Sequence, residues 1–146
     1  MILIAVVDDR MGLCFNHRRL SQDKLLSKKI LDMTEGKMLW MSAYSSRMFG
    51  LEHTQINVDD DCLHEAAEGE YCFIETEDPV IAEKWIEKVI LFRWNRKYPS
   101  DIRFTIDLSK WKLLSTEEFV GNSHEKITME VYNAASASRL LNNRAC

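Results

Sequence analysis

Glycine and proline are scarce in this sequence: its 146 residues include five glycines and two prolines. These residues mark turns and linkers, and no stretch of the chain is rich in both or repeats an internal pattern. Because nothing marks a linker between two units, residues 1–146 are interpreted as a single domain, in which residues 134–146 form a polar C-terminal tail.

Long hydrophobic runs, cysteine pairs and positive net charge are also missing. The apolar run at residues 2–7 is too short for a signal sequence or a membrane span, and no later run is long enough. The four cysteines form no CxxC and are expected to be reduced core residues or free thiols. The net charge of −4 argues against a general nucleic-acid or membrane-surface binder. A cytoplasmic protein is expected, with no membrane partner and a nucleic-acid partner disfavoured.

The chain does contain short apolar runs that alternate with helical patterns. Residues 2–7, "ILIAVV", are continuously apolar and predict a strand buried on both faces, as in a parallel sheet. Three segments near the C-terminus follow one another without helices, which indicates an antiparallel end. The expected fold class is α/β, with three αβα layers and a mixed, mostly parallel sheet that ends in a C-terminal antiparallel hairpin. Other strands are predicted at residues 38–41, 54–58, 71–74, 89–94, 103–108, 110–116 and 126–132, and residues 10–19 are predicted as loop.

Two helix starts carry acidic residues. Ser21 is a good N-cap, which places Asp23 in the first turn of a helix. Asp78 followed by proline predicts a second start, because proline at the first helical position needs no N–H partner. Shorter helices are predicted at residues 43–49 and 62–68. The apolar side chains that the first two helices are expected to bury are Leu26, Ile30, Met33, Ile81 and Trp85.

This order of elements, over about residues 2 to 133, resembles dihydrofolate reductase. "IAVVDDRMGLCFN", "RLSQDK" and "GKMLWMSAYSS" are similar to that family's first strand, glycine-containing loop, acid-bearing helix and second strand, which leads into a cofactor helix. "FIETEDPVIAEKWIEKVILF" aligns without a gap with its strand, glycine turn, helix and strand. Residues 100–132 resemble its closing hairpin, including "NSH" before the last strand. The resemblance implies a dihydrofolate-reductase-like fold.

Departures from that family predict that NADPH is not bound. Glu75, Thr76 and Glu77 stand where the family has glycines, which let the backbone approach the pyrophosphate at a helix N-terminus. With Asp78, three acids are expected to face the helix dipole. A like-charge contact at about 4 Å costs roughly 4 kcal/mol at an effective dielectric near 20. About twenty residues separate the 43–49 helix from the strand at 71–74, so the adenosine-binding part is shortened. No cofactor is expected.

The remnant of the family's substrate cleft supplies the candidate site. Asp23 falls where the family has its catalytic acid, but Ile102 stands near the place of its threonine partner. The basic residue that the family has after its second strand is also absent. Asp23 is the candidate catalytic residue, and its simpler interpretation is an acid that stabilises a helix start. The predicted ligand-binding residues are His17, Arg18, Arg19, Asp23, Ser45 and Ser46.

The whole chain also resembles a group of short bacterial proteins that carry the name ribonuclease Z. "FNHRR", "RWNRKYPSD" and "GNSHEKIT" are among the shared segments. The zinc enzyme properly so called holds two metal ions with an HxHxDH cluster, and no two histidines of this chain lie within ten positions of each other. No metal site is therefore predicted, and no zinc-dependent RNA cleavage.

Three further motifs have a structural and a functional interpretation. His64 and Glu68 stand four residues apart, but "HEAAE" lacks the second histidine of a zinc motif, which favours a solvated helix face. "RWNRKYP" at 93–99 mixes aromatic and basic residues and could stack bases, although packing aromatics with snorkelling basic chains are the more common case. "GNSH" at 121–124 predicts a tight turn, in which a turn hydrogen bond by His124 is favoured over a role in a site.

The sequence therefore predicts a dihydrofolate-reductase-like protein that does not bind NADPH or act as a reductase. It is expected to bind a small anionic ligand or a protein partner. Two alternatives stay open: an enzyme that uses Asp23 with Arg18 or Arg19, and an RNA-binding or RNA-processing protein. Assembly into a homo-oligomer also stays open.

Overall fold

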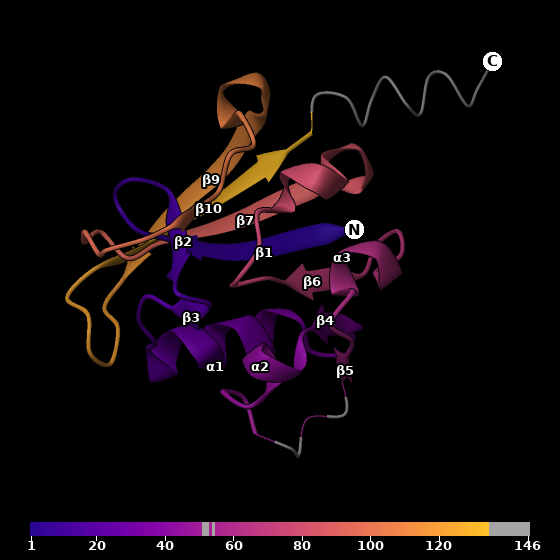
Figure 1. Cartoon of the computed structure of the whole chain (residues 1–146), viewed down its shortest axis with the longest axis horizontal. Coiled ribbons are helices and arrows are strands. Elements are labelled where there is room, and N and C mark those ends of the chain that lie inside the picture. The colour runs from indigo at the N-terminus through magenta and orange to yellow at the C-terminus, as the bar shows by residue number, and fades with distance from the viewer. Residues whose placement is uncertain (51–52, 54, 135–146) are drawn as a thin grey trace.

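A mixed sheet of seven strands forms the centre of the computed structural model, which describes residues 1–50, 53 and 55–134. The strands are β1 (Ile2–Val7), β4 (Leu39–Met41), β5 (Ile56–Val58), β6 (Tyr71–Phe73), β7 (Lys88–Arg93), β9 (Lys112–Phe119) and β10 (Ile127–Asn133). Their order is β5-β4-β6-β1-β7-β10-β9 (Figure 1). The pairings from β5 to β7 are parallel, and β10 is antiparallel to β7 and β9. The predicted α/β class is confirmed, with a mixed, mostly parallel sheet and a C-terminal antiparallel hairpin.

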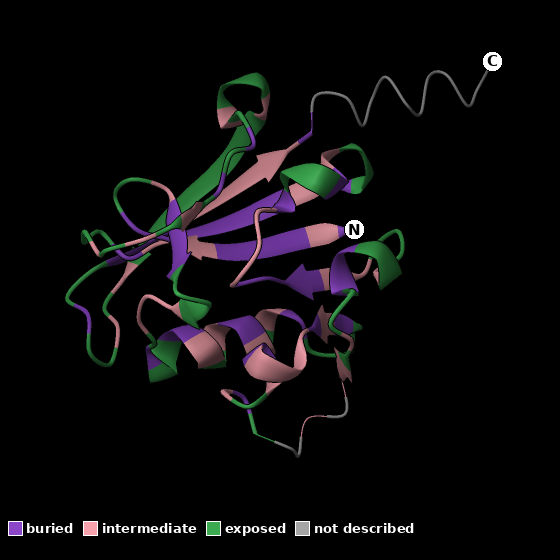
Figure 2. Ribbon diagram, in the orientation of Figure 1, coloured by how far each residue is buried: buried purple, intermediate pink, exposed green. Residues whose placement is uncertain are grey.

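Strand β1 lies in the middle of the sheet, paired with β6 on one side and β7 on the other. Leu3 and Ala5 belong to the apolar cluster on one face, and Ile4 belongs to the cluster on the opposite face. All three are fully buried, and the central strands carry the buried colour in Figure 2. A continuously apolar strand suits this place, since both of its faces are covered by other elements.

Helices α1 (Lys24–Met33) and α2 (Ala43–Ser46) lie on one side of the sheet (Figure 1). Helix α1 buries Leu26 and Ile30, four residues apart, in the same apolar cluster as Ile4 and Phe92 of the sheet. Full burial of one such aliphatic side chain stabilises the fold by about 1.5–3 kcal/mol. This packing fixes the start of α1 over the sheet.

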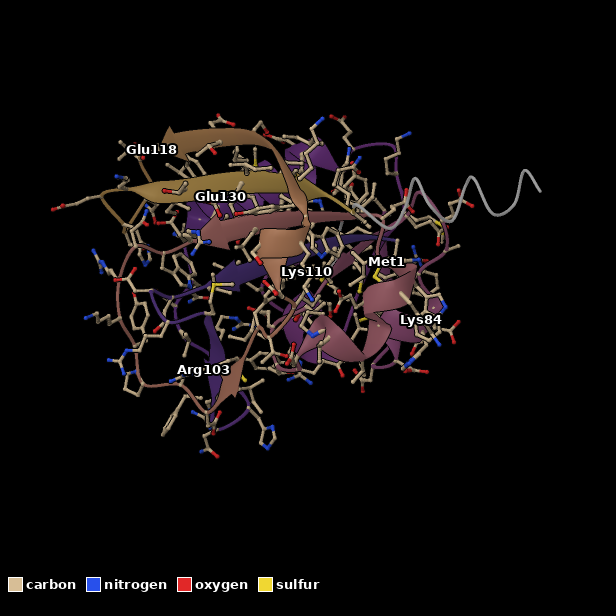
Figure 3. The ribbon with its side chains drawn as sticks, turned by 90° about the horizontal axis from the view of Figure 1, so that it is seen from above. Met1, Lys84, Arg103, Lys110, Glu118 and Glu130 are labelled. Carbon is tan, nitrogen blue, oxygen red and sulfur yellow. The ribbon has the colours of Figure 1, made fainter. Side chains whose placement is uncertain are left out.

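The other face carries short helices and a second sheet. These elements are α3 (Cys62–Glu65), the 3₁₀ helices η1 (Pro79–Trp85) and η2 (Leu108–Lys110), and the three-stranded sheet β3 (Arg18–Arg19), β2 (Gly12–Phe15) and β8 (Ile102–Arg103). Figure 3 looks onto this side, with Lys84 on η1, Lys110 on η2 and Arg103 on β8. Leu63, Ala82 and Phe104 of this layer belong to the same buried cluster as Leu3 of the central sheet. The predicted αβα arrangement implied a helical layer on this face. The structure instead has short helices together with a three-stranded sheet.

Residues 10–19, predicted as loop, contain the hairpin β2–β3. Cys14 pairs with Arg19 and Phe15 with Arg18, so a two-residue turn of Asn16 and His17 joins the strands. Both turn residues have positive φ, 51° and 61°. That conformation is required by a type I′ turn, in which asparagine is favoured.

Two sequence predictions of helical burial were wrong for a common geometric reason. Asp78 does cap the helix at Pro79–Trp85, where its carboxylate accepts the Val80 N–H at 3.1 Å. That helix is 3₁₀, however, and with three residues per turn it buries Pro79 and Ala82. Ile81 and Trp85, four residues apart, share a face only in an α-helix. They are 59% and 49% exposed.

Further boundaries differ from the predictions. Helix α1 begins at Lys24, because Asp23 and not Ser21 is its N-cap. Of the segment predicted as a strand at 103–108, only Arg103 is in a strand. That strand is β8, which belongs to the small sheet. Among the described residues, no helix is long and apolar enough to cross a membrane. Residues 135–146 of the predicted tail and residue 54 of the predicted strand at 54–58 lie outside the described part of the chain.

Candidate functional site

The candidate site lies at one edge of the central sheet. Because β1, β4, β6 and β7 are parallel, their carboxyl ends meet at this edge, and the antiparallel β10 starts there. Glu75 follows β6, Trp94 follows β7, and His124 precedes β10. Ser21 and Asp23 come from the segment between β3 and α1. Open α/β sheets bind ligands beyond the carboxyl ends of their strands.

The Asp23 carboxylate is buried and heavily hydrogen-bonded at this edge. Its side chain has no exposed area. Oδ1 accepts the backbone N–H of Leu25 at 2.9 Å, which caps α1, and that of Asn122 at 2.9 Å. Oδ2 accepts the N–H of Ser123 at 2.8 Å and Nδ1–H of His124 at 2.9 Å. One carboxylate therefore joins the start of α1 to the turn before β10.

Gly121 allows this close approach. A Cβ atom at Gly121 would lie 2.5 Å from Oδ2 of Asp23 and 2.9 Å from Cδ1 of Ile127. Real Cβ atoms essentially never come that close to another atom. The Gly121 N–H donates to the His124 carbonyl at 2.8 Å, which closes the tight turn predicted at 121–124.

These contacts keep Asp23 ionised. Burial by itself raises the pKa of this carboxyl, but the N–H groups of Asn122 and Ser123 and the side chain of His124 outweigh burial and hold the pKa well below its usual range. A carboxylate with such a low pKa holds no proton at neutral pH. This lowered pKa does not favour the role of proton donor that the sequence suggested for Asp23, and that role stays a prediction. Asp23 is placed to orient and stabilise a neighbouring base.

That neighbour is His124, whose Nδ1 lies against Asp23, with the Ser123 hydroxyl 3.1 Å away, and whose Nε2 faces Ser21. Nδ1 donates to Asp23, so Nε2 is left as an acceptor, and the Ser21 hydroxyl lies 2.9 Å from it. The Tyr98 hydroxyl is a more distant neighbour of Nε2, at 3.4 Å. The imidazole is 4% exposed and stacks on the Trp94 ring, with 4.4 Å between centroids and 26° between planes. Ser21, by contrast, is only half-buried.

A second cluster surrounds Glu75. The Arg19 guanidinium donates to both carboxylate oxygens of Glu75, at 2.9 and 3.1 Å, and it lies 4.3 Å from the centre of the Tyr44 ring. The Ser45 hydroxyl, also buried, donates to Glu75 at 2.8 Å. A bidentate pair with a further donor leaves little unmet charge on either side. The sequence suggested that Arg19 holds an external anion, but in the structure its guanidinium is already paired with Glu75.

The three acids of residues 75–78 do not converge on one helix start, so that prediction is corrected. Glu75 turns to Arg19, whereas Glu77 has its pKa raised by burial and by the nearby Asp61 carboxylate. Asp78 caps Val80 and also bonds to Thr105. The chain bends at residues 75–77, so these side chains leave the strand in different directions and do not follow its alternation.

The predicted ligand-binding residues are only partly brought together. Arg19 and Ser45 meet at Glu75. His17 and Arg18 are exposed at the β2–β3 hairpin. The Ser46 hydroxyl bonds within α2, to the Ala43 carbonyl at 2.8 Å. The cap of α2 comes from Ser42, whose hydroxyl accepts the Ser45 N–H at 3.1 Å.

Two spaces adjoin Asp23. The first, between α1 and the sheet, has about 10 Å³ and is walled by Val6, Leu26, Phe73 and Trp94 among others, with Ser21 at its border. It has room for about one water molecule. The second is an open groove of about 870 Å³ along the outer side of α1. Its lining includes Gln22, Lys24, Lys28, Asp32, Glu35, Arg47, Met48, Phe49, His53 and Asn122.

The motifs with weaker signals have structural partners. In the basic–aromatic stretch, Trp94 is 4% exposed and Arg93 pairs with Glu130 at 2.7 Å, so Trp94 does not offer its ring to a base. His64 lies 2.6 Å from Asp61 and packs edge-on to Trp85. Within the described part of the chain, no three histidine, cysteine, aspartate or glutamate side chains are grouped to hold a metal ion.

Comparison of the chain with protein-family models finds no match, and comparison with curated proteins finds none either. The function is therefore inferred from the residues themselves. The sequence prediction singled out Asp23 and the GNSH turn separately, but it missed their contact and the part played by Ser21. The turn that contains Gly121 and His124 could be predicted from the sequence. Nothing in the sequence shows that His124 contacts Asp23, 101 positions earlier, or Ser21, 103 positions earlier.

Proposed function

We propose that the protein is a dihydrofolate-reductase-like protein without NADPH binding or reductase activity, and that it binds a small anionic ligand in the groove along α1. The order of elements supports the fold. A buried first strand is followed by a helix with an acid at its start, then by β4 leading into α2. The β9–β10 hairpin closes the sheet, with the "NSH" residues just before β10. The same order carried the sequence resemblance.

The filled cleft supports the loss of reductase activity. The space between α1 and the sheet has about 10 Å³, which is far below the 300–1,000 Å³ of a typical small-molecule site. Glu75, at a position where the family has glycine, already satisfies Arg19 and Ser45. A dinucleotide phosphate would have to displace this internal carboxylate and would then lie beside an unpaired charge.

The observation that carries the ligand proposal is a pair of cations without acidic partners in the large groove. Lys24 and Arg47 line this space of about 870 Å³, and within residues 1–50, 53 and 55–134 neither makes an ion pair. Arginine and lysine with free donors suit carboxylate or phosphate groups. The half-buried His53 adds a ring that can donate a further hydrogen bond.

The acids of the groove do not cancel these cations. Asp32 pairs with Lys28 at 2.8 Å. Asp23 has both oxygens occupied by N–H donors of the protein. Glu35 is the remaining acid in the lining. The groove therefore presents donors and positive charge at the Lys24 and Arg47 positions, which favours an anion over a neutral ligand.

Thermal unfolding with anionic probes tests this proposal. Inorganic phosphate and succinate are titrated at constant ionic strength, with glycerol as the neutral probe. A probe at ten times its Kd stabilises the folded protein by about 1.4 kcal/mol, or roughly 4 °C in a chain of this size. The shift should disappear in the Lys24→Ala/Arg47→Ala double variant.

The matched control is His17→Ala/Arg18→Ala, which removes two exposed basic side chains from the hairpin outside the groove. We expect it to keep the full shift. Loss of the shift in this control instead would place the anion at the cleft predicted from the sequence. Absence of any shift with both anions in the parent protein would contradict anion binding in the groove.

A further inference from the structure

We propose that Ser21, His124 and Asp23 form a nucleophile–base–acid triad with which the protein hydrolyses small carboxylic esters. The proposal goes beyond ligand binding in the α1 groove and does not depend on it. It is carried by a chain of two hydrogen bonds. The Ser21 hydroxyl oxygen lies 2.9 Å from Nε2 of His124, and Nδ1 of the same ring lies 2.9 Å from Oδ2 of Asp23.

This order of contacts assigns a role to each group. The ionised Asp23 carboxylate only accepts hydrogen bonds, so it fixes the His124 tautomer that carries its proton on Nδ1. Nε2 is then a base aimed at the Ser21 hydroxyl, which is how a serine is activated in acyl transfer. Asp23 acts through the imidazole and is a positioning residue, whereas Ser21 and His124 would touch the reacting atoms.

The supporting groups are held rigidly. The backbone N–H groups of Leu25, Asn122 and Ser123 fix the Asp23 carboxylate, and the Trp94 ring lies flat against the imidazole. Rigid positioning of this kind is what a nucleophile and base need, since small displacements of reacting groups cost large factors in rate. A plain helix cap would need only the two bonds to the start of α1.

The exposure of the three residues also suits catalysis. Asp23 and His124 are buried, whereas Ser21 is half-buried and reachable from outside. Gln22 and Met48 line both the small space beside Ser21 and the large groove, so the two adjoin. The small space has about 10 Å³, room for about one water molecule, so an ester has to reach Ser21 from the adjoining large groove. The backbone N–H of Gln22 has no acceptor within the described residues. In α/β-hydrolases the N–H after the nucleophile serves the oxyanion.

The reaction balances with water as the second reactant. Oγ of Ser21 attacks the ester carbonyl carbon while its proton passes to Nε2 of His124. The carbon–oxygen bond to the alcohol breaks, and the alcohol leaves with that proton. Water then attacks the acyl-serine and gives a proton to Nε2. The acid leaves as Nε2 returns the proton to Ser21, so one ester and one water give one acid and one alcohol.

Covalent labelling tests the nucleophile directly. Diethyl fluorophosphate is expected to form a phosphorus–oxygen bond at Ser21 with loss of fluoride. Trypsin would release the adduct in residues 20–24, "LSQDK", which contain a single serine for mass spectrometry. Heat-unfolded protein should give no adduct. Hydrolysis of p-nitrophenyl acetate, which is uncharged, is measured in parallel, and Ser21→Ala should lower it at least about 100-fold.

The control variant is Ser115→Ala, which removes an exposed hydroxyl from β9 and should leave labelling and hydrolysis unchanged. Asp23→Asn should slow labelling of Ser21, because it removes the carboxylate that orients the imidazole. If that variant fails to fold, Ser21→Ala still decides the outcome, since it removes one hydroxyl. Folded parent protein without an adduct on residues 20–24, or with hydrolysis equal to that of Ser21→Ala, would overturn the proposal. Absence of the thermal-unfolding shift with anions would contradict ligand binding in the groove, but it would not contradict the triad.

Discussion

Replacement of Asp23 by asparagine should cost the protein much of its stability. Asparagine keeps one carbonyl oxygen, which can still accept the N–H groups of Leu25 and Asn122 and cap α1. It replaces Oδ2 by an NH₂ group, which cannot accept the Ser123 N–H now held at 2.8 Å. The predicted damage therefore lies in the turn before β10 and not in the helix.

The size of the effect follows from that lost acceptor. A hydrogen bond to a charged group contributes about 1.5–3 kcal/mol, and a buried donor left unsatisfied costs about 1–3 kcal/mol. The imidazole of His124 can adapt by exchanging its tautomer, so its contribution is partly retained. We expect Asp23→Asn to lower the free energy of unfolding by about 3 kcal/mol at pH 7. Urea unfolding followed by tryptophan fluorescence measures this difference.

The same variant should change the pH dependence of stability. The pKa of Asp23 is lower in the folded than in the unfolded protein, so its contribution is present above the ordinary aspartate pKa of about 3.9 and is lost as pH falls towards the folded pKa. The difference between parent and Asp23→Asn should therefore shrink below about pH 4. A difference under about 0.5 kcal/mol at pH 7, or one that stays constant down to pH 2, would refute this reasoning.

The control for Asp23→Asn is Asp107→Asn. Asp107 caps η2 by accepting the Ser109 N–H at 3.1 Å, but its site is exposed to solvent. Water can replace the lost acceptor there, so we expect a much smaller change in stability than at Asp23. Equal effects at both positions would show that burial of the carboxylate is not the cause.

Three further outcomes are expected. Gly121→Ala should destabilise the protein by about 2 kcal/mol in urea unfolding, since its Cβ would lie 2.5 Å from Asp23, and an unchanged midpoint would contradict the close approach. Glu75→Gln should lower stability by about 2 kcal/mol in the same assay, because Arg19 loses its charged partner. NADPH should release no binding heat in calorimetry at low salt, and a low-micromolar dissociation constant would overturn the proposed loss of cofactor binding.

The sequence by itself determined the main elements of the sheet. A continuous apolar run predicted β1 as a buried parallel strand, and the C-terminal segments predicted the antiparallel hairpin. These predictions succeeded because both features can be read from local sequence. A strand buried on both faces is a continuous apolar run, and consecutive strand patterns with no helical pattern between them indicate an antiparallel hairpin. The cap by Asp78 was likewise local, since it depends on residues two positions apart.

Tertiary structure decided which faces are buried and which charges meet. Helix η1 has three residues per turn and not 3.6, and for this reason Ile81 and Trp85 are exposed. Nothing in the sequence of this segment distinguishes a 3₁₀ helix from a short α-helix. Arg19 was expected to bind an external anion, but Glu75, 56 positions later, neutralises it. Pairing at such a distance depends on strand order.

At the candidate site, the sequence predicted the separate residues, whereas the tertiary structure decided that they meet. The sequence marked Asp23 as a helix-start acid and His124 as a turn residue, each from its near neighbours. Only the packing of α1 against the sheet brings Asp23 and Ser21 to the start of β10, where His124 lies, 101 and 103 positions away in the sequence. Local propensity acts over a few residues, whereas this contact depends on how parallel strands align their carboxyl ends with the start of an antiparallel one.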